Sequence, residues 1–307
     1  MSLKTFTVFT PTYNRGYKIT DLYHSLCNQT YTDFEWLIVD DGSTDNTQEL
    51  VEKFKKDGVL DIRYFLKDNG GKHTAINMAS DLAHGEWFFI VDSDDYLTHD
   101  ALERALCYCK MVENDTRCAG VVGLRGNTKG DVWATGSVEK ISQHKTGNAK
   151  GVDEEYIDAT AVEYRYKYKI QGDRAEIVRT SILKKYKFPV FSDERFMPES
   201  YLWFSLSRDG YYMRWFNQVI YITEYLEDGL TQNGKMLAKR SCKSRSLVDN
   251  LAVSIPGIPF KSKLKMSINY YRYGRYGGNS IVSLLRKSSS KMLSAIAIPI
   301  AVVTKIR

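Results

Sequence analysis

The stretch from Trp87 to Asp95 constrains the fold of this chain more than any other. Its first five residues, Trp87 to Val91, are apolar, and carboxylates begin where they stop, at Asp92 and Asp94. An apolar run of this length is typical of a strand buried on both faces of a parallel sheet, so the acids follow the strand's carboxyl end. Open α/β sheets bind ligands at that edge, and alternate residues of an extended chain point to the same side.

Asp92 and Asp94 therefore have the chemistry of a cation site. Oxygen ligands suit a hard divalent cation such as Mg²⁺ or Mn²⁺, which commonly joins protein carboxylates to the phosphates of a substrate. The alternative is an acidic turn that only caps the next helix, because short acidic clusters are common at turns. The loops that follow the other strands bear on this choice.

Strand-like runs alternate with helical patterns through the first part of the chain. In addition to the central run, strands are expected at Thr5–Thr10, Glu35–Val39, Ile62–Leu66 and Ala119–Leu124. The first three of these are followed by the polar loops Pro11–Gly16, Asp40–Asp45 and Asp68–His73. This alternation predicts an α/β fold, a doubly wound, mostly parallel sheet whose polar loops gather along one nucleotide-binding edge.

The second half of the chain has a weaker pattern. Residues 125–170 are expected to form a long, partly irregular excursion, and such loops are usually functional or mobile. A short helix is expected over Ile177–Lys184, and another begins near Glu199. Met213–Phe216 and Val219–Ile222 are expected to pair as a hairpin.

Composition limits the class of protein. The chain is 43% hydrophobic, as a globular protein is, and its five cysteines include only Cys107 and Cys109 at close spacing. That pattern favours a reducing compartment and argues against a disulfide framework or a zinc site. The N-terminus enters a strand-like run without a charged and then apolar leader, so we expect a cytoplasmic protein.

The C-terminal residues differ in charge from the rest. From Asn250 onward there are ten Lys or Arg and no Asp or Glu, which leaves −4 for residues 1–249 out of a total of +6. The apolar run Met292–Val303 is shorter than the roughly 20 residues that a bilayer span needs. An interfacial position on an anionic membrane fits its basic neighbours. The alternative is a terminal helix packed on the core with a solvated basic face, and nucleic-acid binding by Tyr270–Tyr276 is less favoured.

Four motifs together resemble the family-two inverting glycosyltransferases of GT-A fold. They are Pro11-Thr12-Tyr13-Asn14-Arg15, Asp40-Asp41-Gly42-Ser43, Asp92-Ser93-Asp94-Asp95 and Pro198-Glu199-Ser200-Tyr201-Leu202-Trp203. The resemblance covers roughly Lys4 to Thr231, which implies a GT-A domain over residues 1–231. Residues 232–307 lie outside it and are expected, from their charge and apolar run, to form a basic, helical, membrane-associating extension. It implies nucleotide contacts from Thr12, Tyr13 and Arg15, with Asp41 as partner of the base N–H. Asp92 is implied near the ribose and metal, and Asp94 on the metal.

The chain departs from that family's pattern in two places. Aligned on Leu202-Trp203, Glu199 stands where the family commonly has its catalytic Asp, and Asp228 lies near the position of a metal-binding His. The resemblance therefore implies Glu199 as general base and Asp228 as a further metal ligand.

Three other groups of residues are expected at the site. Lys72, with His73, begins a helix after a glycine-rich loop and is expected near the diphosphate, although a solvated helix start is the alternative. Asp173, Arg174 and Trp203 are expected to bind substrate. For Asp173 and Arg174 the alternative is an exposed salt bridge.

The expected activity is transfer of a sugar from a nucleotide-diphosphate sugar, with UDP-sugars favoured, to a hydroxyl of a glycan or lipid-linked glycan. Mg²⁺ or Mn²⁺ would stabilise the leaving group, while one carboxylate deprotonates the acceptor and the configuration inverts. The resemblance places such an enzyme in bacterial polysaccharide or glycoconjugate synthesis, at the inner face of the cell membrane. The alternatives are a nucleotidyltransferase and a non-catalytic, membrane-docked binding protein. The oligomeric state stays open.

Overall fold

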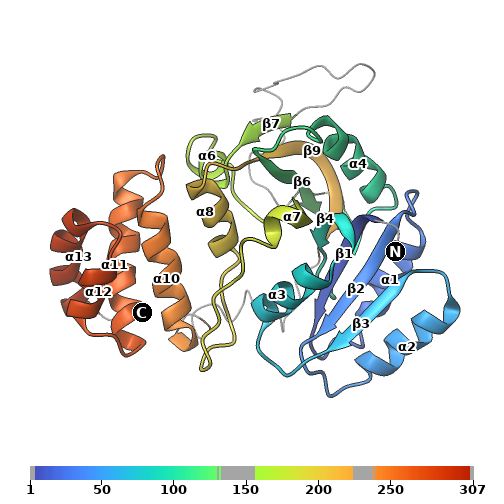
Figure 1. The fold of residues 1–307 in the computed structure, drawn as a ribbon, viewed down its shortest axis with the longest axis horizontal. Coiled ribbons are helices and arrows are strands. Elements are labelled where there is room, and N and C mark those ends of the chain that lie inside the picture. The colour runs from blue at the N-terminus through green and yellow to red at the C-terminus, as the bar shows by residue number, and fades with distance from the viewer. Residues whose placement is uncertain (1–3, 130, 133–155, 224–236, 238, 305–307) are drawn as a thin grey trace.

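The computed structural model describes residues 4–129, 131–132, 156–223, 237 and 239–304. In its first part, strands and helices alternate as the sequence predicts (Figure 1). The order is β1 (Lys4–Thr12), α1 (Ile19–Cys27), β2 (Phe34–Asp40), α2 (Thr47–Asp57), β3 (Ile62–Leu66), α3 (Lys72–Leu82), β4 (Gly85–Ile90), β5 (Tyr96–Leu97), α4 (Ala101–Met111) and β6 (Cys118–Gly126). It continues with β7 (Tyr156–Ala159), α6 (Ala161–Tyr166), β8 (Arg174–Arg179), α7 (Thr180–Leu183), α8 (Ser200–Arg208) and β9 (Tyr212–Ile222).

The strands of the described residues form one mixed sheet. Its order is β3-β2-β1-β4-β8-β6-β9-β5, and β7 pairs with β9. The first four strands named in that order are mutually parallel, and β6 is parallel to β9. β8 runs antiparallel between β4 and β6, so it begins at the edge where β4 ends. The prediction of a mostly parallel α/β sheet is confirmed.

Both faces of the sheet are covered, which is why its central strands are apolar on both sides. One face packs against α1, α2 and α4, and includes Trp36, Phe89 and Ile177. The other packs against α3, α6, α7 and α8, and includes Phe88, Ile90 and Val178. Asp92 and Glu176 continue the alternation of this second face, toward α3 and α8.

One expectation about local structure is wrong, and a second is right only in part. Met213 to Ile222 is part of one strand, not a hairpin, because β9 pairs along its length with β6 and takes up Asn217 and Gln218 where the pairing register shifts. Of the helix expected at Ile177–Lys184, Thr180–Leu183 is helical, whereas Ile177–Arg179 is the end of strand β8. The branched side chains Ile177 and Val178 fill a gap between β4 and β6 that only an extended chain can fill.

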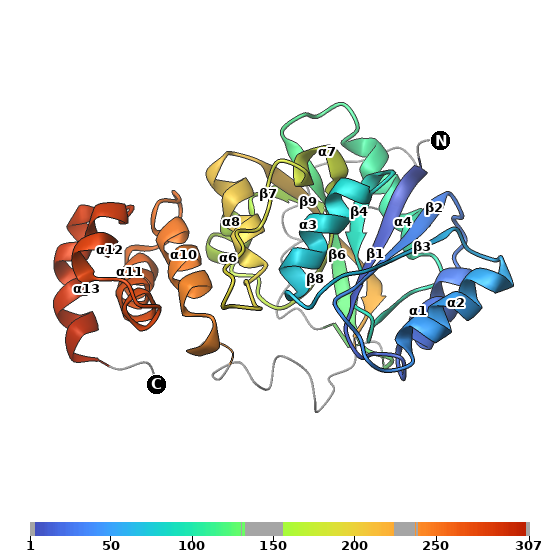
Figure 2. The ribbon, with the colours of Figure 1, turned by 60° about the horizontal axis from the view of Figure 1, so that its bottom comes forward.

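The C-terminal helices are α10 (Cys242–Val253), α11 (Phe260–Tyr276), α12 (Ile281–Lys287) and α13 (Lys291–Val303). They lie at one end of the long axis, with the sheet at the other (Figures 1 and 2). α10 packs on the core that contains α8, through Val248 and Ala252. α11, α12 and α13 share a separate small core.

Glu194 joins α10 to the segment that leads into α8. Its buried carboxylate accepts hydrogen bonds from the backbone N–H groups of Lys243 (2.6 Å) and Ser244 (2.9 Å), in the first turn of α10. Asp193 beside it forms an ion pair with the Lys243 ammonium at 2.6 Å. α10 is therefore docked on the part of the chain that contains the sheet and α8.

Among the described helices, none is both long enough and apolar enough to cross a bilayer. All five cysteines are free thiols.

Candidate active site

The loops that follow β1 and β2 are fastened to each other. Asn14 adopts a left-handed conformation, with φ of 52°, and its backbone N–H donates to the Ser43 hydroxyl at 2.8 Å. Its side-chain oxygen accepts from the Thr44 backbone N–H at 2.8 Å, and the Gly16 N–H donates to Asp45 at 3.0 Å. Asn tolerates positive φ better than most residues because its short side chain bonds locally. These bonds give the two loops a fixed relative position at the sheet edge.

Asp41 holds the next loop in place. Its buried carboxylate accepts from the Lys67 ammonium (2.5 Å) and from the backbone N–H groups of Gly70 (2.9 Å) and Gly71 (2.7 Å). A carboxylate has about four acceptor positions, so three are used and one is left for a ligand. Thr12 lies beside it, since the Asp41 backbone N–H donates to the Thr12 carbonyl at 2.8 Å. The buried Thr12 hydroxyl has no hydrogen-bond partner among the described residues.

The acids after β4 face three cations of the same edge. Asp92 lies 2.5 Å from the Lys72 ammonium and 3.9 Å from the guanidinium of Arg125. Burial alone would raise the pKa of Asp92, but Lys72 and Arg125 outweigh it and lower that pKa. Asp94 lies 3.8 Å from Arg15. Burial and the neighbouring charge of Asp92 raise the pKa of Asp94, so these two carboxylates repel each other.

Asp95 belongs to a buried network beneath this pair. Its carboxylate accepts from the Tyr221 hydroxyl at 2.8 Å and lies 3.5 Å from Arg125. The same hydroxyl accepts from the Asp92 backbone N–H at 2.9 Å, and the Arg125 guanidinium stacks on the Tyr221 ring at 4.0 Å. Burial, together with the charge of Asp92, raises the pKa of Asp95 to about 7. β6 and β9 thus brace the acidic turn from below.

Lys72 connects the acids of β4 to the helix at the other side of the site. Its ammonium lies 2.7 Å from Glu199 while it also contacts Asp92. Lys72 is the first residue of α3, and Glu199 directly precedes α8. Burial would lower the pKa of Lys72, but Asp92 and Glu199 raise it, so Lys72 stays charged. Glu199 therefore lies at the same edge of the sheet as Asp92, with the Lys72 ammonium between the two carboxylates.

Glu176 adds a third carboxylate on this face. It lies in β8 opposite Val122, on the face that carries α3 and α8. Burial raises the pKa of Glu176 to about 7, against the opposing effect of Arg125, and the charge of Glu199 raises it further.

Comparison with known proteins decides the family. Residues 7–169, more than half of the chain, match the family described as Glycosyl transferase family 2. The chain belongs to glycosyl transferase family 2.

Curated relatives match only part of this family-2 chain. It is 36% identical over 123 residues to the poly(ribitol-phosphate) beta-N-acetylglucosaminyltransferase TarS of Staphylococcus aureus, over 39% of this chain and 22% of TarS. It is 38% identical over 101 residues to the putative teichuronic acid biosynthesis glycosyltransferase TuaG of Bacillus subtilis, over 33% of this chain and 40% of TuaG. The chain matches less than half the length of these relatives.

Solved structures extend the fold similarity of this family-2 chain to most of its length. S. aureus TarS 1-349 in complex with UDP-GlcNAc gives a TM-score of 0.55 at 19% identity, over 97% of this chain and 80% of that one. Mannosyltransferase PcManGT from Pyrobaculum calidifontis, in complex with GDP-Man and Mn²⁺, gives 0.56 at 16% identity, over 98% and 81%. The GT-A fold predicted from the sequence is therefore confirmed.

The structure brings several of the predicted family-2 site residues together. Lys72 pairs with both Asp92 and Glu199, and Arg15 pairs with Asp94, two residues beyond Asp92. Lys72 was predicted to lie near a diphosphate. In the structure the same ammonium contacts the carboxylates of Asp92 and Glu199.

Thr12 and Asp41, which were predicted to contact the nucleotide, lie side by side at the ends of β1 and β2. Tyr13 between the loops is 48% exposed. An exposed ring beside buried polar atoms leaves a flat apolar surface at the edge of the site.

The predicted substrate contacts are less uniform. Arg174 is only 3% exposed, and its guanidinium donates to the Tyr164 hydroxyl and to the carbonyls of Asp173 and Gln171. In this structure Arg174 orders its own loop through these bonds. The alternative, an exposed salt bridge of Asp173 and Arg174, is therefore not found among the described residues. Asp173 is exposed, and Trp203 is half-buried against the core. Asp228 lies outside the described residues.

Sequence reasoning missed Arg125, Tyr221 and Glu176. Arg125 and Tyr221 are strand residues distant in sequence from every motif, and they meet only because β6 pairs with β9. Glu176 was hidden because its segment reads as the start of a helix. The unusual signal was a charged residue within the apolar run Ala175–Val178, since buried charges in strands are rare without a role.

The family-2 fold implies a divalent cation, and the residues present fit one. Among the described side chains, no three His, Cys, Asp or Glu residues gather closely enough to form a complete metal site. Asp92 and Asp94 supply two carboxylates whose repulsion a cation would relieve. Diphosphate oxygens usually complete such coordination, because Mg²⁺ is commonly held by one or two carboxylates and substrate phosphates.

Proposed function

We propose that this protein is a metal-dependent, inverting hexosyltransferase that moves a sugar from a UDP-sugar to a hydroxyl of a glycan or lipid-linked glycan. The proposal rests chiefly on the ion pairs of Lys72, which link Asp92 on the donor side to Glu199 on the opposite side. A transferase needs a leaving-group site and a base that face each other across one reacting carbon.

The donor side is the edge formed by the first two loops and Asp41. The unpartnered Thr12 hydroxyl, the remaining acceptor position of Asp41 and the exposed Tyr13 ring suit a base and ribose. Arg15 and Lys72 supply positive charge for a diphosphate. The UDP-GlcNAc complex of TarS supports a UDP-sugar as donor.

Asp94 and Asp92 would hold the cation, and the Mn²⁺ and GDP-Man complex of a protein with the same fold supports its use. When bound, a divalent cation stabilises the negative charge on the departing diphosphate. Asp95 and Arg125 orient the acidic turn from behind through Tyr221. Whether Asp228 joins them stays a prediction.

Glu199 is the proposed general base. Its carboxylate takes the proton of the acceptor hydroxyl as the hydroxyl oxygen attacks the anomeric carbon and the carbon–diphosphate bond breaks. Attack from the face opposite the leaving group inverts the configuration. Lys72 holds the Glu199 carboxylate in place through their ion pair, and Asp173 and Trp203 are the proposed acceptor-side contacts.

Two rival functions share parts of this site. A nucleotidyltransferase needs a basic, glycine-rich loop after the first strand, and Pro11–Gly16 has one Arg and one Gly. A non-catalytic binding protein does not need Glu199 beside Asp92, and the ion pairs of Lys72 favour the enzyme over it.

The test is a screen of nucleotide sugars for hydrolysis and transfer, with Mn²⁺, with Mg²⁺ and with a chelator. We expect turnover of a UDP-sugar that the chelator abolishes, and an inverted anomer in the product by NMR. Asp94→Asn should lose metal-dependent turnover, whereas the exposed Asp61→Asn should keep it. Chelator-resistant transfer at the wild-type rate would exclude the metal, and a nucleotidyl product would exclude sugar transfer.

We further propose the division into a GT-A domain over residues 1–231 and an extension over residues 232–307. The separate core of α11, α12 and α13 supports it, and α10 is the part of the extension that docks on the catalytic domain. The proposed partner of the extension is an anionic membrane surface, at the cytoplasmic face of the cell membrane. The free thiols fit such a reducing location.

A further inference from the structure

α13 has an exposed face without a polar side chain. Met292 is 70% exposed, Ile296 43% and Val303 80%, and Ala295 and Pro299 between them are also exposed. From Met292 to Val303 the helix contains no charged residue. Contiguous apolar surface of this kind marks a contact with another protein or with lipid.

The opposite face of α13 fixes which side points outward. Leu293 is buried, and Ala297 and Ala301 are buried in the small core with Tyr270 and Tyr271 of α11. The end of the helix is held as well, because Arg272 donates to the Thr304 hydroxyl at 2.8 Å and Arg275 to the Ala301 carbonyl at 3.3 Å. The apolar outer face is therefore a fixed surface of the folded protein.

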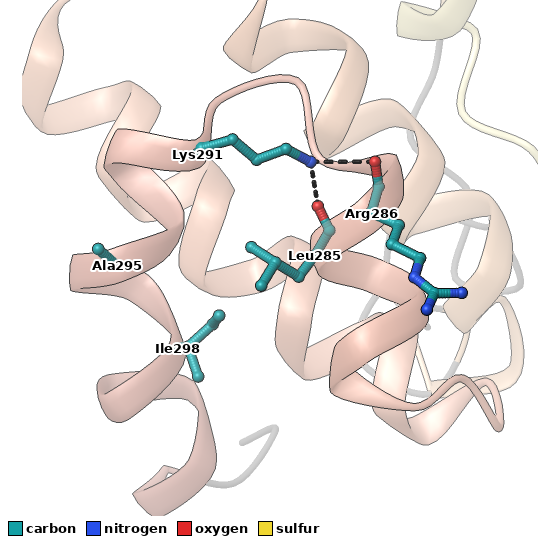
Figure 3. Close-up of a pocket in the computed structure, with 5 residues that line it drawn as sticks. All are labelled: Leu285, Arg286, Lys291, Ala295 and Ile298. Atoms are coloured by element: carbon teal, nitrogen blue, oxygen red, sulfur yellow. Dashed lines mark hydrogen bonds between the residues drawn. The ribbon is translucent and has the colours of Figure 1, made fainter.

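α12 extends this surface and adds positive charge. Its exposed side chains include Val282 and Leu285, followed by Arg286 and Lys287. A shallow hollow of about 490 Å³ between α12 and α13 is lined by Leu285, Arg286, Lys291, Ala295 and Ile298 (Figure 3). Lys291 donates to the carbonyls of Leu285 and Arg286, so it closes the end of α12, while the Arg286 guanidinium projects away from those bonds.

We propose that this outer face of α12 and α13 lies flat on an anionic phospholipid surface, with the hollow receiving lipid. This inference rests on the proposed membrane partner and assigns the contact to two helices. The apolar face suits the acyl boundary, and the flanking cations suit anionic headgroups.

An apolar face also suggests contact with a second copy of the chain. Charge disfavours that contact. Two copies meeting through this face would bring two segments together that each carry ten cations and no acid after Asn250. Like charges facing each other across a contact disfavour it, whereas anionic lipid neutralises them.

The test is flotation of the full-length protein with vesicles of phosphatidylcholine containing 30% phosphatidylglycerol (on the order of one anionic lipid in three), compared with phosphatidylcholine alone. We expect binding to the anionic vesicles that weakens in high salt. Ile296→Glu and Val303→Glu should each weaken vesicle binding about tenfold or more, because each replaces an apolar side chain that contacts lipid in the bound state with a charged one. The matched control is Val59→Glu, since Val59 is a 60% exposed valine on the catalytic domain and the change in charge is the same.

Three results would overturn the proposal. They are absence of wild-type binding, equal loss in Val59→Glu and Val303→Glu, and a wild-type dimer by light scattering that Ile296→Glu dissociates. Vesicle binding is measured without donor or acceptor, so its failure is independent of whether the enzyme activity is found. Circular dichroism confirms that the variants are folded.

Discussion

At the scale of single residues, the site is organised by few cations among many acids. Lys72 is shared by Asp92 and Glu199, and Arg125 lies near both Asp92 and Asp95. Lys72 and Arg125 together lower the pKa of Asp92, because each ion pair favours the charged form. Substitutions here should separate binding from chemistry.

The first such substitution is Glu199→Gln. The amide keeps the size of the side chain but cannot take a proton, so transfer should fall about 10²–10⁴-fold. Donor affinity should change little, since the base serves the acceptor. Turnover and UDP calorimetry measure the two, with Glu113→Gln as an exposed control, and turnover within a few-fold of wild type would exclude Glu199 as the base.

A second concerns Glu176, whose pKa is raised from 4.5 to about 7 by burial. Folding favours its protonated form, so this group adds stability below about pH 4.5 that is lost as pH rises through 7. Glu176→Gln stays neutral and should therefore be more stable than wild type at pH 8.5, by about 3 kcal/mol for the full shift.

At pH 4.5 the Glu176→Gln variant and the wild type should unfold at similar temperatures. Thermal unfolding followed at both pH values measures the difference. Destabilisation of the variant at pH 8.5 would mean that the ionised carboxylate is stabilised by Arg125, contrary to the raised pKa.

At the scale of elements, a glycine at the start of α3 decides how closely two segments approach. Gly71 has φ of 93°, and a Cβ there would lie 1.9 Å from the Arg195 carbonyl oxygen. Its N–H also donates to Asp41. The position therefore sets the distance from α3, which carries Lys72, to the segment before Glu199.

Gly71→Ala should lower both stability and turnover. Gly58→Ala is the matched control, because Gly58 also has positive φ, 67°, but a Cβ there meets nothing within 4 Å. The control should cost about 1 kcal/mol of unfolding free energy from backbone strain alone, with normal turnover. Equal effects of both changes in a denaturation series and an activity assay would mean that the approach to Arg195 has no role.

Elements could be predicted from the sequence when the residues that determine them are neighbours in the sequence. The first four strands are apolar runs with polar loops after them, and the structure has strands there; the runs of β1, β2 and β4 are almost wholly buried. The course of β8 and β9 was partly misread, because their partners lie far away in sequence: β8 pairs with β4 and β6, and β9 pairs with β5, β6 and β7. The same cause hid Arg125, Tyr221 and Glu176, whereas the motif residues Asp92 and Glu199 were found from neighbours in sequence.

At the scale of the whole molecule, the C-terminal helices contribute to the catalytic core. Val248 and Ala252 of α10 are buried in it, and Lys243 and Ser244 donate to buried Glu194. A chain that ends at Arg240 leaves this carboxylate without those donors and exposes the apolar surface beneath α10. Both losses are destabilising, by about 1–3 kcal/mol for the hydrogen bonds alone.

We therefore expect the chain ending at Arg240 to melt at a lower temperature and to lose turnover of donor. A chain ending at Gly278 removes only α12 and α13, so it should keep α10 and most of the soluble activity. Calorimetry and donor hydrolysis measure both. Full activity without α10 would show that the extension is dispensable for the catalytic domain.

The helices packed between the proposed lipid-facing surface and α8 also determine how far Glu199 lies from the membrane. α13 contacts α11, α11 contacts α10, and α10 contacts α8 (Figures 1 and 2). Packed helices are about 8–10 Å apart, so three such steps hold Glu199 about 25–30 Å above the surface on which α13 rests. An acceptor hydroxyl at the level of the lipid headgroups cannot reach Glu199 while α13 rests on the membrane and these helices stay packed together. An enzyme held in this way would extend chains that already project far from the membrane, and would leave the first sugar on a lipid to other transferases.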